Sequence, residues 1–179
     1  RDYYPTARLF ALQGLKNVSP KVALIAARKM TDDQDIWVRS AAVELLGDEG
    51  GTEAVEEIRG YLKSYDVPIK LAASAGLVKL GEKHYIKEVL EPLTHPIPDR
   101  RYQAIGHLGK IGTKEVLPHL VKLFEHTEPE MVFYSLKALE GKATLEMLPR
   151  LRELTKHPNH DIRQAAAMAM SNLPEAEAD

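Results

Sequence analysis

The fold is decided by ten residues, VRSAAVELLG at positions 38–47, which return as IKLAASAGLV at 69–78 and as IRQAAAMAMS at 162–171. The shared pattern is an apolar residue, a basic residue, any residue and then two alanines. Weaker copies begin at Ala7, Arg100 and Met131. The six starts lie at residues 7, 38, 69, 100, 131 and 162, each 31 residues after the one before. A spacing held without any insertion predicts a protein built from one repeated unit.

Each unit has room for two α-helices. In the stretch quoted above, apolar or small residues fall at unit positions 1, 4, 5, 8, 9 and 12, which share one face of a helix. Small residues at positions 4, 5 and 8 let a neighbouring backbone approach closely. Residues 1–6 are too few to supply a first helix for the unit that begins at Ala7, so we expect that unit to lack one. The quoted stretch is the second helix of each unit. The first helix is expected from another amphipathic stretch, which lies between successive copies, for example at Ala54, Val55, Ile58, Tyr61 and Leu62.

The composition narrows the class of protein. The chain has 179 residues, of which 44% are hydrophobic and 28% charged, values that are typical of a folded globular protein. It has no cysteine, which excludes disulfides and thiolate chemistry. Its 24 basic and 26 acidic residues give a net charge of −2, so no overall field attracts nucleic acid. No apolar run reaches the roughly 20 residues of a membrane span. We expect a soluble protein, cytoplasmic by preference, with no nucleic-acid partner and no membrane insertion.

The repeats predict a single domain over residues 1–174. Pro174 ends the last helix, and the residues after it, 175–179, are expected to form an acidic disordered tail. The chain starts at Arg1 rather than at a methionine, and the start falls inside a repeat. We therefore expect the sequence to be a piece of a longer chain.

The basic-x-Ala-Ala core after an acidic turn, as in Asp35-x-x-Val38-Arg39-x-Ala41-Ala42, resembles the HEAT repeat. The short form found in phycobilin-lyase-type (E-Z) proteins is the most similar. The resemblance implies an all-α, right-handed α-solenoid of about six two-helix HEAT-like repeats of 31 residues, with first helices on the convex side and second helices on the concave side. Val132 departs from the pattern, because a basic residue is expected there.

The sequence contains no arrangement typical of an active site. Neither His-Glu-x-x-His nor Gly-x-Ser-x-Gly occurs. The run Gly106-x-x-Gly109-x-x-Gly112 superficially resembles a phosphate-binding loop, but no strand is expected before it, and helix packing and termination explain it better. We expect no catalytic residue in this chain, which leaves open that it belongs to a larger enzyme.

Histidines are the other candidate for chemistry. His95, His126 and His157 share one unit position, and we expect them to be cations near helix ends rather than metal ligands. His157-x-x-His160-Asp161 is the best local metal candidate, yet two histidines in a turn are a weak signal. We expect neither a metal site nor a cofactor.

Cations recur at unit position 2. They could bind an acidic ligand, but in HEAT-like repeats such residues usually pair with an acidic turn residue of their own or the next unit, and Asp35, Asp66, Asp99 and Asp161 are placed to do so. The members of this row are Arg8, Arg39, Lys70, Arg101 and Arg163.

Unit positions 3, 6 and 10 point away from the core of each helix pair and toward the predicted concave face. Several of these positions are apolar, which is typical of an interaction surface. The alternative is that neighbouring second helices bury position 6 between them. Gly106 and Gly109 are expected to leave space beside the aromatic ring of Tyr102. The predicted partner-binding residues are Leu71, Val78, Tyr102, Ile105, Phe133 and Leu136.

These features favour a non-catalytic scaffold that binds a partner protein or peptide along its concave face. A C-terminal accessory domain of a larger enzyme is the alternative, because Asp35-x-Trp37-Val38-Arg39 resembles segments of some zinc aminopeptidases. A third possibility, bilin-lyase-like chromophore binding, is implied by the repeat type alone. The sequence leaves the oligomeric state open.

Overall fold

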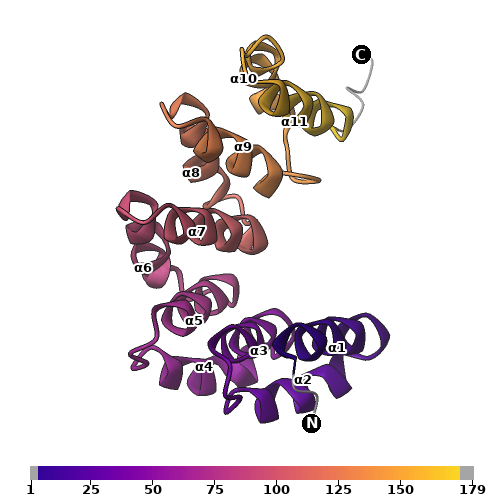
Figure 1. Cartoon of the computed structure of the whole chain (residues 1–179), viewed down its shortest axis with the longest axis vertical. Coiled ribbons are helices and arrows are strands. Elements are labelled where there is room, and N and C mark those ends of the chain that lie inside the picture. Colours follow the sequence, from indigo (N-terminus) through magenta and orange to yellow (C-terminus); the bar gives the residue numbers. More distant parts are fainter. Residues whose placement is uncertain (1–3, 174–179) are drawn as a thin grey trace. The chain divides into compact units, whose positions relative to one another are not determined.

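The second helix of each predicted unit is present in the computed structural model, which describes residues 4–173 (Figure 1). Each of these helices starts 31 residues after the preceding one, so the predicted period is confirmed. No β-strand occurs in the described residues. The second helices are α1 (Pro5–Val18), α3 (Ile36–Glu49), α5 (Val67–Lys79), α7 (Pro98–Ile111), α9 (Pro129–Ala138) and α11 (His160–Ser171).

The first helices are mostly shorter, and a single turn of 3-10 helix flanks most of them. No first helix precedes α1 within residues 4–173, as the repeat count predicted. The described part of the chain is therefore an all-α solenoid of two-helix repeats, which is the predicted fold class. The predicted acidic tail at 175–179 lies outside the described residues. The first helices are α2 (Pro20–Met30), α4 (Val55–Tyr61), α6 (Ile86–Leu90), α8 (Leu117–Lys122) and α10 (Leu148–Leu154).

The chain forms two compact units, Arg1–Leu90 and Glu91–Asp179. In the first unit, α3 packs against α1, α2 and α5, and α4 packs against α5. In the second unit, α9 packs against α7, α8 and α11, and α10 packs against α11. The same two kinds of contact thus occur in both units: first helix with second helix, and second helix with second helix.

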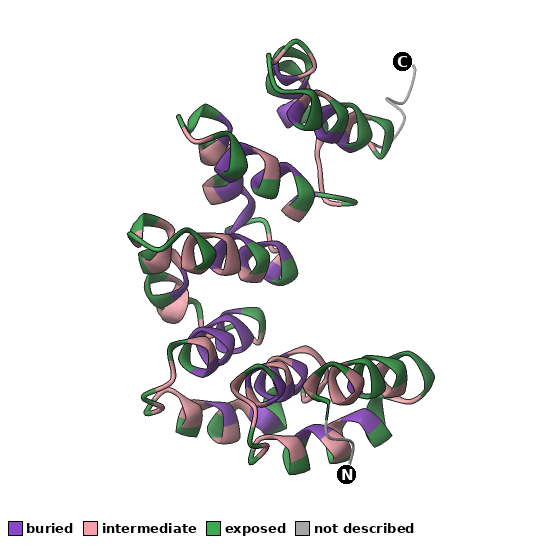
Figure 2. Ribbon diagram, in the orientation of Figure 1, coloured by how far each residue is buried: buried purple, intermediate pink, exposed green. Residues whose placement is uncertain are grey.

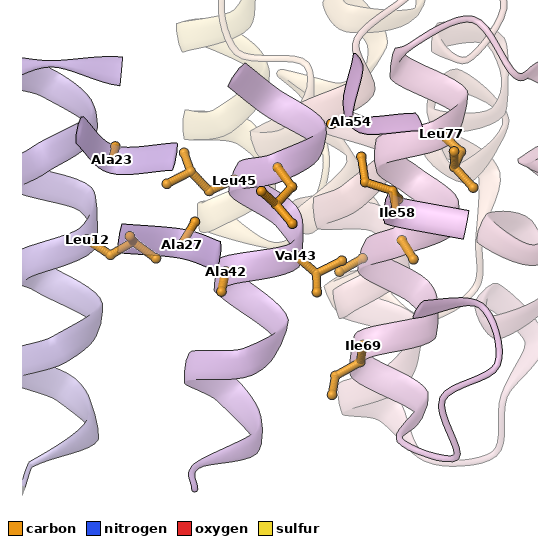
Figure 3. Close-up of a cluster of buried hydrophobic side chains, with 13 residues drawn as sticks. Leu12, Ala23, Ala27, Ala42, Val43, Leu45, Ala54, Ile58, Ile69 and Leu77 are labelled. Atoms are coloured by element: carbon orange, nitrogen blue, oxygen red, sulfur yellow. The ribbon is translucent and has the colours of Figure 1, made fainter. Parts of the chain in front are cut away.

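Small residues bring the second helices of the first unit together. A Cβ added to Gly47 of α3 would lie 2.5 Å from the Cα of Gly76 in α5, so the two backbones touch at this point. Helix α5 is buried along most of its length (Figure 2). Larger side chains such as Leu45, Ile58 and Leu77 fill the space between the helices (Figure 3).

The second unit repeats this close approach between α7 and α9. A Cβ on Gly109 would lie 2.7 Å from the Cβ of Ala138, and Gly112 ends α7 in the left-handed conformation with φ 60°. Helix packing and helix termination therefore account for two of the three glycines of the Gly106-x-x-Gly109-x-x-Gly112 run, as predicted. Gly106 is exposed, and a Cβ added to it would meet no side chain or neighbouring helix within 4 Å.

The turn that precedes each second helix after α1 has its own repeated hydrogen bond. In five consecutive turns a side chain accepts a hydrogen bond from the backbone N–H two residues further on, at 2.9–3.1 Å. An acceptor at this position stabilises the tight turn, and the turn sets the direction in which the next helix begins. The accepting residues are Asp33, Ser64, His95, His126 and His157, each 31 positions after the one before.

Among residues 4–173, every helix is too short or too polar to cross a lipid bilayer.

Candidate functional site

Four of the six predicted partner-binding residues belong to the interior. Leu71 and Val78 of α5, in the first unit, are 4% and 6% exposed. Ile105 of α7 and Leu136 of α9, in the second unit, are each 1% exposed. The exposed apolar strip expected along these side chains is therefore absent, and the alternative prediction, burial at unit position 6, describes Ile105 and Leu136 correctly.

The other two predicted residues, Tyr102 and Phe133, are partly exposed and belong to one aromatic cluster in the second unit. The ring of Tyr102 on α7 lies 4.6 Å from that of Tyr134 on α9, measured between centroids, with 34° between the planes. Phe133 meets Tyr134 edge to face at 5.4 Å. Tyr134 is 41% exposed. We call Tyr102, Phe133 and Tyr134 the aromatic surface.

Tyr134 was not among the predicted residues, although the sequence carries a signal for it. Tyr134 occupies unit position 4, where other repeats have Ala41, Ala72 and Ala165. An aromatic residue at an alanine position of a closely packed repeat cannot enter the helix interface, so its ring lies partly on the surface. The departure from the repeat consensus was therefore the informative feature.

Tyr102 is held in place by a carboxylate. Its hydroxyl donates a hydrogen bond of 2.8 Å to Oε1 of Glu128, and the Arg101 guanidinium pairs with the same carboxylate at 2.7 Å. Burial, which is the larger cause, and the hydrogen bond to Glu128 raise the pKa of Tyr102 to about 12. The hydroxyl therefore remains protonated near neutral pH. The hydrogen bonds from Arg101 and Tyr102 in turn hold the pKa of Glu128 below its usual value.

The cations at unit position 2 are largely occupied within the protein. Arg8 pairs with Asp33 at 2.7 Å, and Arg39 pairs with Asp66 of the next turn at 2.9 Å. The pairing of Arg39 with Asp66 was predicted, whereas the use of Asp33 and Glu128 as partners was missed. Position 2 thus serves to join repeats rather than to present a row of open cations.

The arginines of this row also tie down the turn before their own helix. Nη1 of Arg39, of Arg101 and of Arg163 each donates to two backbone carbonyls five and six residues earlier, at 2.7–3.2 Å. The predicted partners Asp35 and Asp161 instead lie at helix starts, where the Asp35 carboxylate caps α3. Lys70 is exposed, and Val132 is buried at this position.

The three histidines in register are turn residues. Nδ1 of His95, His126 and His157 accepts the backbone N–H described above, so all three rings help to shape the turn before a second helix. The expectation that they act as cations near helix ends stays a prediction. Within residues 4–173, no group of three histidine or carboxylate side chains is placed to hold a metal ion.

A hollow of about 480 Å³ lies between α8 and α10, and no residue of the aromatic surface lines it. Its apolar part is formed by Leu117, Pro118, Val121 and Met147. Its rim carries charges of both signs, Lys114 and Arg150 against Glu146. Because these charges favour no particular ligand, the hollow identifies no ligand class.

Comparison with known proteins finds a family model that matches one repeat. Residues 100–126 match the family model "PBS lyase HEAT-like repeat". No match was found among curated proteins.

Several solved structures resemble the chain at low identity. An engineered protein aligns with a TM-score of 0.49 and 16% identity, covering 90% of this chain and 83% of that one. The complex of CpcE and CpcF of phycocyanin lyase from Nostoc sp. PCC7120 aligns with a TM-score of 0.49 and 22% identity, covering 86% of this chain and 65% of that one. Computationally designed armadillo repeat proteins for modular peptide recognition align with a TM-score of 0.45 and 18% identity, covering 91% and 86%. The match of residues 100–126 to the PBS lyase HEAT-like repeat agrees with the resemblance seen in the sequence.

Proposed function

We propose that this chain is a non-catalytic scaffold that binds a partner protein or peptide, and that the aromatic surface on α7 and α9 is the contact. The observation that carries the proposal is the exposed ring of Tyr134 beside Tyr102 and Phe133. Aromatic residues make up 6% of the chain, so three rings in contact at a surface are a concentrated feature. Tyrosine is enriched among the residues that contribute most to binding at protein interfaces.

The chemistry of this surface supports binding rather than catalysis. Glu128 accepts hydrogen bonds from Arg101 and Tyr102, which leaves its carboxylate engaged in positioning the ring. The raised pKa of Tyr102 keeps its hydroxyl protonated, so it is a poor general base. Proteins with stacked helical repeats present extended surfaces of this kind to their partners.

Display of a random peptide library on the full chain tests the proposal. Peptides selected on the unmodified protein are expected to lose at least ten-fold in affinity against a Phe133→Ser/Tyr134→Ser variant. The matched control is Tyr65→Ser, because Tyr65 is a fully exposed ring in the other unit. Fluorescence anisotropy gives the affinities, and circular dichroism with thermal melting shows whether each variant remains folded.

The single variant Tyr134→Ser covers the case in which the double variant unfolds, because a side chain that is 41% exposed contributes little to the interior. Selected peptides that bind the folded variant as tightly as the unmodified chain contradict the proposal. A library that yields no enriched peptide contradicts it as well.

An accessory role in a larger enzyme is the alternative proposal, and it uses the same surface. In that case the aromatic surface packs against a catalytic domain of the same polypeptide, and an isolated catalytic domain added in trans competes with the selected peptides. Binding of a bilin chromophore is a second candidate, favoured by the family of the repeat at 100–126. Titration with phycocyanobilin tests it, since a bound bilin changes its visible absorbance spectrum.

A further inference from the structure

We infer that the aromatic surface takes a cationic anchor, an arginine or lysine side chain of the partner laid against Tyr134 and beside Glu130. The inference rests on the proposed function and names the chemistry of its partner. It combines the open ring of Tyr134, the electron-rich environment of Tyr102 and an acidic side chain without a counter-ion.

The ring of Tyr134 is available from solution. Tyr102 covers one side of it at 4.6 Å, and the edge of Phe133 lies 5.4 Å from its centroid. The residue nevertheless keeps 41% of its surface exposed. The face of an aromatic ring carries partial negative charge, so an exposed face attracts a cation.

The neighbouring ring increases this attraction. When the Tyr102 hydroxyl donates to the Glu128 carboxylate, electron density shifts toward the phenol oxygen and into the ring. The cluster already attracts one cation, because Cζ of Arg101 lies 6.0 Å from the centroid of the Tyr102 ring. A second guanidinium or ammonium group from a partner would meet the same kind of field at Tyr134.

The charges around Tyr134 leave one carboxylate uncompensated. Glu130 is exposed in the first turn of α9, and no ion pair to it occurs among residues 4–173. Glu130 and Tyr134 are four residues apart on one helix, which places them on the same face. Glu128 is neutralised by Arg101, and Lys137, the nearby cation, pairs with Glu140 at 3.3 Å.

This local charge decides between partner classes. An acidic side chain would be repelled by Glu130, and an apolar side chain would leave the carboxylate without any partner. An arginine satisfies both features, because its planar guanidinium stacks on a ring while its N–H groups donate to a carboxylate. We therefore expect arginine to be preferred over lysine, and both over uncharged side chains.

The peptides selected in the display experiment provide the probe. An anchor position rich in arginine or lysine is expected among peptides that bind the unmodified chain. Replacing the anchor arginine by citrulline, which keeps the shape and removes the charge, should weaken binding about five-fold. The same replacement should change affinity by less than two-fold on the variants Glu130→Gln and Tyr134→Leu. Glu146→Gln is the matched control, because it removes an exposed carboxylate elsewhere in the second unit.

The outcomes separate this inference from the proposed function. If the selected peptides require Phe133 and Tyr134 but show no basic anchor, or if citrulline binds as well as arginine, the cationic anchor is wrong and the scaffold proposal stands. If binding does not require the aromatic surface, both fail. An arginine preference that persists unchanged in Glu130→Gln and in Tyr134→Leu overturns the assigned site.

Discussion

At the scale of single residues, two buried serines differ in whether their hydroxyl has a partner. Ser74 of α5 and Ser135 of α9 are both 0% exposed. Oγ of Ser135 donates to the carbonyl of Val132 at 2.7 Å, whereas Oγ of Ser74 has no hydrogen-bond partner. A buried hydroxyl without a partner has lost its hydration and gained nothing in exchange.

We predict that Ser74→Ala raises the free energy of unfolding by about 1 kcal/mol, because it removes this unsatisfied group. Ser135→Ala is the matched control, since both changes improve helix propensity equally but only the control removes a hydrogen bond. Urea unfolding followed by circular dichroism measures both. Equal stabilisation by the two changes would show that the Ser74 hydroxyl is satisfied in solution.

Asp48 is a second residue whose environment makes a measurable prediction. Its carboxylate pairs at 2.6 Å with Lys16 of α1 and at 2.6 Å with Lys79 of α5, so one side chain on α3 joins three helices. Burial raises the pKa of Asp48, but the hydrogen bonds and charges of the two lysines outweigh burial and hold the pKa below its usual value. The charged carboxylate is therefore favoured in the folded state.

A carboxyl with a lowered pKa in the folded state stabilises the fold above its unfolded pKa, near 3.8, and this contribution is lost as pH falls through the folded pKa. Asp48→Asn should therefore cost about 1 kcal/mol at pH 7 and progressively less below about pH 4. Unfolding in urea at a series of pH values measures the gap between the two proteins. A gap that stays constant from pH 7 to pH 3 contradicts this assignment.

At the scale of helices, the approach of α3 and α5 depends on glycine. Gly47 and Gly76 meet backbone to backbone, and a Cβ on Gly47 would lie 2.5 Å from the Cα of Gly76. Gly14 of α1 is the useful comparison, because it occupies the same unit position as Gly76 and no side chain or neighbouring helix lies within 4 Å of its added Cβ. These glycines are all helical, and they differ in how much room the neighbouring helix leaves for an added Cβ.

We predict that Gly47→Ala lowers the free energy of unfolding by about 2 kcal/mol, because α3 and α5 must separate to admit the methyl group. Gly14→Ala should instead raise it by about 0.5–1 kcal/mol through helix propensity alone. Chemical unfolding of the two variants gives both values. Stabilisation by Gly47→Ala would mean that the two helices do not touch in solution.

The same scale shows what the sequence could predict and what it could not. The helix starts followed from the period, because each unit repeats its turn and its apolar face. The burial of Leu71 and Val78 did not follow, and that of Ile105 and Leu136 followed only from the alternative prediction, since a helical wheel gives directions around one helix and not the distance to the next. Close glycine and alanine contacts bring the second helices near enough to bury these positions.

The candidate site was predictable only in part for a related reason. Tyr102 and Phe133 were found from their positions in the unit, and both are partly exposed. Their partner Tyr134 departs from the alanine of the repeat, so the repeat pattern did not predict it. The sequence also did not predict that His126 and its equivalents accept a backbone hydrogen bond. An imidazole nitrogen can donate or accept, and the path of the backbone around the ring determines which it does.

At the scale of the whole molecule, the period continues through residues 90 and 91, where the two compact units meet in the sequence. No residue is inserted there, and helices on both sides keep the 31-residue spacing. An ordinary boundary between domains has a linker, often rich in proline, glycine or polar residues. The uninterrupted repeat therefore continues to predict one domain over residues 1–174.

Native-state hydrogen exchange with Gly47→Ala tests that prediction. In a repeat protein each repeat is stabilised by its neighbours. A defect in one repeat therefore lowers the stability of every repeat that unfolds together with it. If the chain is one domain, Gly47→Ala lowers amide protection in α7, α9 and α11 as well as in α3 and α5. Mass spectrometry of peptic fragments at moderate urea locates the loss, with Gly14→Ala as the variant expected to lower protection nowhere. A loss confined to residues 4–90 means that the two units unfold independently, and the unbroken period would then reflect the ancestry of the repeats rather than their cooperation.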